Sequence, residues 1–132
     1  MLDRYPTQVK VVFKNFPIRS HRYAVKAAAA ALAAGKQDRF WEFHDLLFES
    51  YNKLNDKMIT GFARSLNLDM KRFEKDRASA EVAKLIKRDL QEARDADVRG
   101  TPTIFVNGKL LQVRSMDGFS RAIDLELKKS SP

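Results

Sequence analysis

The hydrophobic pattern begins with a predicted strand. Residues 8–17 open with β-branched and aromatic residues, and the apolar run Val11, Val12 and Phe13 suits a strand buried on both faces of a parallel sheet. Pro17 follows this run and ends the strand. The sequence therefore predicts a first strand over residues 9–13.

Two helices are predicted next, one rich in alanine and one rich in aromatic residues. Residues 23–34 are strong helix formers, with Ser20 as a plausible N-cap and Gly35 as a stop that can take the left-handed conformation. Asp38 can cap the following helix, whose apolar positions fall within about half of a helical wheel. We expect that helix to carry the largest share of the aromatic core. Its apolar positions are Phe40, Trp41, Phe43, His44, Leu47, Phe48 and Tyr51.

Polar caps mark three further helices. Asn55 or Asp56 begins the first, Asp69 begins a short second one, and Ser79 begins a longer helix that runs to about residue 96. Mixed charges surround the apolar stripe of the longest helix. The inward positions of the three are Met58, Ile59, Phe62, Ala63, Leu66, Met70, Phe73, Val82, Ile86, Leu90 and Ala93.

The C-terminal part of the chain predicts a hairpin and a helix. Asn107 and Gly108 join apolar runs at 103–106 and 109–113, and this pair is the one that a type I′ turn prefers. Ser115 or Asp117 then begins an amphipathic helix. Strand, helices, hairpin and helix in this order indicate a layered α/β domain rather than a helix bundle.

Composition narrows the chemistry. The 132 residues fit a single domain over 1–132, and no apolar run is long enough to cross a membrane. The N-terminus lacks the basic and apolar pattern of a secretory signal, so the localisation stays unknown. The chain has no cysteine, which excludes disulfides, thiolate metal sites and cysteine nucleophiles. Its net charge of +8 is dispersed along the sequence rather than gathered in one run.

Other candidate sites have simpler explanations. His44 has no partner at ligand spacing, so helix packing explains it better than a metal, and we expect neither a metal nor another cofactor. His21 lies in a polar loop, and neither histidine can be linked to a nucleophile. Helical spacing favours core packing over a stacking surface for Trp41. Basic residues over 71–88 alternate with acidic ones, so nucleic acid is the least favoured partner.

Four segments together resemble the DsbA-like family of thioredoxin-fold thiol–disulfide oxidoreductases. These segments are VVFKNFP at 11–17, the alanine helix with its glycine, FWEFHDLLF at 40–48 and GTPTIFVNG at 100–108. The resemblance covers about residues 5–127, and the order and spacing of the segments make it specific. It implies a truncated thioredoxin-like α/β fold with an inserted helical subdomain over about residues 20–97.

In that family a first strand and a helix carrying Cys-x-x-Cys precede the part that this chain resembles. Residues 2–6 resemble the end of that helix, so the resemblance implies an N-terminally incomplete domain. Disulfide exchange needs a thiolate and a second, resolving thiol, and we therefore expect no catalytic residue in this chain.

The family segment that faces the cysteines is retained. The resemblance implies a cis bond before Pro102 and a backbone that pairs with an extended substrate peptide, whereas a trans proline that starts an edge strand is the alternative. The implied substrate-binding residues are Gly100, Thr101, Pro102 and Thr103.

The resemblance also places the missing strand between the predicted strands at 9–13 and 103–106. Without it, two strand edges would expose unpaired backbone groups beside apolar side chains. We expect the chain to close this gap by pairing or strand swapping in a homo-oligomer, or by bringing its own two strands together.

Three functions stay open. The chain is part of an active oxidoreductase whose cysteines lie upstream, or it is a redox-inactive module that binds an extended peptide, a protein thiol substrate or another partner through Thr101 and Pro102. The third is a basic nucleic-acid-binding domain.

Overall fold

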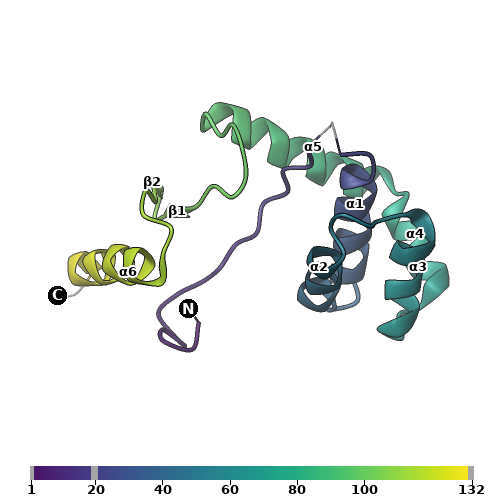
Figure 1. The fold of residues 1–132 in the computed structure, drawn as a ribbon, viewed down its shortest axis with the longest axis horizontal. Coiled ribbons are helices and arrows are strands. Elements are labelled where there is room, and N and C mark those ends of the chain that lie inside the picture. The colour runs from purple at the N-terminus through teal and green to yellow at the C-terminus, as the bar shows by residue number, and fades with distance from the viewer. Residues whose placement is uncertain (1, 19–20, 131–132) are drawn as a thin grey trace. The chain divides into compact units, whose positions relative to one another are not determined.

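The structure of the chain, a computed structural model, describes residues 2–18 and 21–130. In this part of the chain, helices α1–α5 are followed by the strands β1 and β2 and by helix α6 (Figure 1). The elements are α1 (Ala24–Gly35), α2 (Phe40–Glu49), α3 (Asp56–Ser65), α4 (Met70–Arg77), α5 (Ala80–Asp95), β1 (Phe105–Val106), β2 (Lys109–Leu110) and α6 (Met116–Ser130).

The chain divides into two compact units. The helical unit is Asn15–Asp97, and the hairpin unit combines Met1–Lys14 with Val98–Pro132. Among residues 2–18 and 21–130, no helix has both the length and the apolar character needed to span a membrane.

Helix α1 is the centre of the helical unit. It contacts α2, α3, α4 and α5, because its small alanine side chains let the neighbouring helices approach closely. The larger core side chains come from the surrounding helices, where Phe43 packs edge-on against Phe62 and tilted against Phe73. The core of this unit thus combines small side chains at its centre with aromatic ones around it. The buried alanines of α1 are Ala27, Ala30, Ala31, Ala33 and Ala34.

Side-chain caps begin three helices of this unit as predicted. The side chains of Asn55, Asp69 and Ser79 each accept a hydrogen bond from the backbone N–H three residues further on, at 2.8, 3.2 and 3.2 Å. These bonds satisfy N–H groups that have no partner within the helix. The sequence therefore predicted the starts of α3, α4 and α5 correctly.

The residues predicted to cap or stop α1 and α2 do not all have these roles in the structure. The expected N-cap Ser20 lies outside the described residues, and α1 begins after Tyr23 without a side-chain cap. Gly35 is the last residue of α1 and does not take the left-handed conformation. It instead lets Phe40 pack closely against α1, because a Cβ at position 35 would lie 3.3 Å from the Cβ of Phe40. Asp38 does not cap α2, because its own backbone takes the left-handed conformation, with φ of 60°.

The aromatic face of α2 is buried only in part. Phe43 and Leu47 are buried, whereas Trp41, Phe48 and Tyr51 are 46%, 61% and 75% exposed. The core packing expected for Trp41 was therefore wrong, and only part of the expected aromatic face of this helix joins the core. The physical reason is that the surface of α2 that contacts α1 and α3 is narrower than the apolar face of the helix, so the apolar residues at the edges of that face stay exposed.

The predicted buried strand over 9–13 is absent. Residues 9–18 form neither helix nor strand, and Val11 and Val12 are 47% and 61% exposed. A strand exists only where a neighbour accepts and donates its backbone hydrogen bonds, and the one sheet among the described residues contains β1 and β2 alone. Closure of the gap by the chain's own two strands is therefore not found in this structure.

The hairpin unit contains the predicted type I′ turn. Strands β1 and β2 are antiparallel, and Asn107 and Gly108 between them have φ of 48° and 80°. The ladder is shorter than the sequence predicted, although Leu111 N–H still donates to the Ile104 carbonyl at 2.8 Å. The hairpin is confirmed.

Helix α6 is fixed at its start and along one side. The Ser115 hydroxyl accepts a hydrogen bond from Gly118 N–H at 3.0 Å, which confirms the predicted N-terminal region of this helix. Ile123 is buried, as is Tyr5 of the N-terminal segment, whose hydroxyl donates to Oδ1 of Asp124 at 2.7 Å. These contacts fix the N-terminal segment against α6 within the hairpin unit.

Candidate functional site

The turn formed by Gly100, Thr101, Pro102 and Thr103 precedes β1, and we refer to it as the 100–103 turn. Its peptide bond between Thr101 and Pro102 is cis, the form that the family resemblance implies. Thr101 and Pro102 are exposed, and the Thr103 hydroxyl donates to the Gly100 carbonyl at 2.6 Å. All four predicted substrate-binding residues therefore lie in one turn that a side-chain hydrogen bond closes.

Arg114 is a further residue of this site, and the sequence did not reveal it. Its guanidinium Nη1 donates to the Pro102 carbonyl, across 12 positions of sequence. The segment that carries Arg114 passes very close to α6, because the place where a Cβ of Gly118 would lie is taken by the carbonyl of Val113. Glycine at 118 thus permits the close approach that positions Arg114 near the turn.

The backbone groups of Thr101 define what the site can do chemically. Within the described part of the chain, no hydrogen bond involves the N–H or the carbonyl of Thr101, and an extended peptide can pair with such groups. No thiol is available in the chain to attack a disulfide. The site can therefore offer recognition of a peptide backbone, but it cannot supply the electron pair for disulfide exchange.

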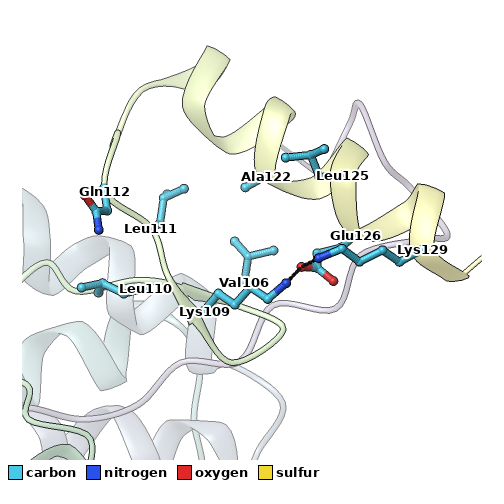
Figure 2. Close-up of a pocket in the computed structure, with 9 residues that line it drawn as sticks. All are labelled: Val106, Lys109, Leu110, Leu111, Gln112, Ala122, Leu125, Glu126 and Lys129. Atoms are coloured by element: carbon cyan, nitrogen blue, oxygen red, sulfur yellow. Dashed lines mark hydrogen bonds and ion pairs between the residues drawn. The ribbon is translucent and has the colours of Figure 1, made fainter.

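A shallow groove lies elsewhere in the hairpin unit, between the hairpin and α6 (Figure 2). It has a volume of about 170 Å³ and is lined by residues that include Val106, Leu111 and Leu125, but by none of the 100–103 turn. One ion pair crosses it, with Lys109 Nζ of β2 at 2.9 Å from Oε1 of Glu126 on α6, and Lys129 Nζ of the same helix lies 3.3 Å from that oxygen. The hydrogen bond from Lys109 lowers the pKa of this carboxyl, Glu126, below its usual value. We assign the pair between Lys109 and Glu126 to fixing the hairpin on α6.

Among the described residues of the helical unit, we find no second chemical centre. His44 packs between aromatic rings of α2, with its ring centroid 4.4 Å from that of Phe48, as expected for a helix-packing histidine. Across residues 2–18 and 21–130, no cluster of three or more histidines and carboxylates could hold a metal ion. Acidic residues pair with some of the basic residues over 71–88, as in the 2.7 Å contact between Arg77 and Glu74.

The fold and the turn define a thioredoxin-like domain with high helical content and a small sheet. The sequence model of the family described as DSBA-like thioredoxin domain matches residues 1–124. This chain belongs to that family. The family and the fold class expected from the four sequence segments are thereby confirmed.

Curated relatives and a solved structure agree with this assignment. The chain is 32% identical over 130 residues to the probable disulfide bond formation protein D of Bacillus anthracis, a match that covers 92% of this chain and 59% of that protein. It is 41% identical over 104 residues to the Na⁺/H⁺ antiporter NhaA 1 of Salinispora arenicola, covering 78% of this chain and 16% of that protein. The chain thus spans less than two thirds of either relative.

The structural comparison covers most of the chain. The crystal structure of a thioredoxin-like oxidoreductase from Silicibacter pomeroyi superposes with a TM-score of 0.78 and 27% sequence identity. The superposition includes 91% of this chain and 69% of that one.

Proposed function

We propose that this chain is the peptide-binding part of a DsbA-like thiol–disulfide oxidoreductase and is redox-inactive as it stands. The observation that supports the proposal is that Thr101 is exposed and that its N–H and carbonyl form no hydrogen bond within the described residues, in a family member that has no cysteine. Thiol chemistry then requires sulfur atoms from outside this sequence, whereas recognition of the substrate backbone does not.

Peptide binding at the 100–103 turn follows the logic of strand addition. An extended peptide donates an N–H to the Thr101 carbonyl and accepts from the Thr101 N–H, so the main chain supplies affinity without requiring one side-chain sequence. The bonds of Thr103 to Gly100 and of Arg114 to Pro102 hold both sides of Thr101 in place. Because the turn is already formed, little conformational entropy is lost on binding.

An NMR titration tests this proposal. Isotope-labelled chain is titrated with a blocked, uncharged peptide of alternating valine and threonine with a central glutamine, and the amide signals of Thr101 and Thr103 are followed. We expect saturable shifts at these two amides. A matched peptide, N-methylated at alternate positions, has lost the donors that strand addition needs and should cause no such shifts. Equal shifts with both peptides, or none with either, would contradict peptide binding at this turn.

We also propose that the chain associates with a second copy through extended segments. The support is the apolar segment over residues 9–13, which lies outside any sheet and exposes Val11 and Val12, because such segments pair readily with the edge of a short sheet. Light scattering over a concentration series should show a dimer that Val12→Lys disrupts. A chain that stays monomeric at the highest concentrations would rule this association out.

The redox-inactive binding module stays the alternative to an oxidoreductase whose thiols lie upstream. Translating the DNA that precedes Met1 in frame separates the two. A strand pattern followed by Cys-x-x-Cys favours the oxidoreductase, and an in-frame stop favours the binding module.

A further inference from the structure

We propose that Arg114 makes the 100–103 turn selective for extended peptides that carry a carboxylate. This inference rests on the proposed peptide binding and names the class of peptide that binds best. The carboxylate is either an aspartate or glutamate side chain or the C-terminal carboxylate of the peptide.

The charge around the turn points to an anionic ligand. Residues 98–116 contain Arg99, Lys109 and Arg114 but no aspartate or glutamate, and one aspartate flanks this stretch on each side, Asp97 and Asp117. Lys109 is paired with Glu126 of α6 at 2.9 Å and adds little net charge. The positive charge of Arg114, by contrast, lies directly at the turn, because its guanidinium contacts the carbonyl of Pro102.

Arg114 retains donors for a ligand. A guanidinium has five N–H donors in a planar fork, and the bond to Pro102 uses only Nη1. Arg114 is exposed, and within the described residues no carboxylate forms an ion pair with it. A carboxylate next to the residue that pairs with Thr101 can therefore accept a charge-assisted hydrogen bond from the same guanidinium.

The position of Arg114 is built into the start of α6. Ser115 accepts the N–H of Gly118, and the Val113 carbonyl occupies the space beside Gly118 that any larger residue would fill. Asp117, in the first turn of α6, is the nearest acidic residue in the sequence, and it forms no described ion pair with Arg114. Arg114 is thus held at the turn by its own segment and is not neutralised by the first turn of α6.

Matched peptides test the inference on the whole chain. The uncharged valine and threonine peptide with a central glutamine is compared with the same peptide carrying glutamate, and with the glutamine peptide ending in a free carboxylate. Affinities are measured from the amide shifts of Thr101 and Thr103. Arg114→Gln removes the charge and Arg114→Lys keeps it. As the control, Arg121→Gln removes an exposed arginine of α6.

We expect a peptide with a carboxylate to bind about fivefold more tightly than the uncharged one, because an exposed ion pair is worth on the order of this factor. Which of the two charged peptides gains affinity identifies the carboxylate source. The gain should vanish in Arg114→Gln, persist in Arg114→Lys and Arg121→Gln, and shrink with added salt. Equal affinities for all three peptides, or a gain that survives Arg114→Gln, would overturn the selectivity while leaving peptide binding intact. If no peptide shifts these amides, peptide binding itself is refuted, and the selectivity with it.

Discussion

Replacing Gly61 and Gly118 by alanine, one at a time, tests how a new Cβ affects stability where the surrounding space is empty and where it is already occupied. Gly61 in α3 and Gly118 in α6 both lie in helices, where alanine is favoured over glycine by about 1 kcal/mol. A Cβ at Gly61 meets nothing within 4 Å, so Gly61→Ala should stabilise the helical unit by about 0.5–1 kcal/mol. At Gly118 the same Cβ would overlap the backbone carbonyl of Val113 and lie 2.9 Å from the Val113 Cβ.

The cost at Gly118 is larger than the gain in helix propensity. Overpacking against a backbone group costs about 1–3 kcal/mol, and moving the segment before α6 also breaks the cap from Ser115, which is worth about 1 kcal/mol. After the propensity gain is subtracted, Gly118→Ala should destabilise the hairpin unit by about 1–3 kcal/mol. The same movement should shift the NMR signals of Thr101 and Thr103, since Arg114 bonds to the turn between them.

Hydrogen exchange measures the two effects separately. Amides of α3 report on Gly61→Ala and amides of α6 report on Gly118→Ala, so neither result depends on the two units unfolding together. The reasoning is refuted if Gly118→Ala protects α6 as much as Gly61→Ala protects α3. It also fails if α6 is weakened while the turn signals stay unchanged.

Two further predictions concern the cores of the two units. Phe43→Ala should lower the free energy of unfolding by about 3–5 kcal/mol, because Phe43 is fully buried. Phe48→Ala, at a position that is 61% exposed, should lower it by less than about 0.5 kcal/mol. Urea titrations measure both values, and similar costs would contradict the packing of α2. The hydrogen bond to Asp124 raises the pKa of Tyr5 above its usual 10.0, so the stability that the Tyr5 hydroxyl adds is complete below pH 10.0 and is lost as the pH rises through the raised pKa. The difference in unfolding free energy between the chain and Tyr5→Phe should shrink at alkaline pH, and a difference independent of pH would disprove this bond.

Local signals in the sequence predicted the helices and the hairpin. Asn55, Asp69 and Ser79 act within three residues of their own positions, and the turn at Asn107 and Gly108 depends on backbone conformation at two adjacent residues. These interactions depend only on residues close together in the sequence, so the helix starts and the hairpin turn could be predicted from it.

Contacts between distant residues could not be predicted in the same way. The buried carboxylate of Asp89 accepts hydrogen bonds from the backbone N–H and the side-chain amide of Asn15, 74 positions away, and neither residue shows a local sign of it. Arg114 reaches Pro102 only because of the chain path past Gly118. The 9–13 segment has a strand pattern, but a pattern of side chains does not provide the neighbouring strand that its backbone needs.

The four predicted site residues came from the family resemblance and not from periodicity. Their sequence GTPT contains a proline and small residues that could start any edge strand. The resemblance singled out the turn, and the structure added the bonds that hold it, from Thr103 and Arg114.

The insulin-reduction assay tests the central claim most directly. The chain contains no cysteine, so neither a mixed disulfide nor its resolution can form on it. We predict a rate equal to the uncatalysed background at every concentration of the chain, with dithiothreitol as the reductant. A rate that rises in proportion to the concentration of the chain would contradict the account.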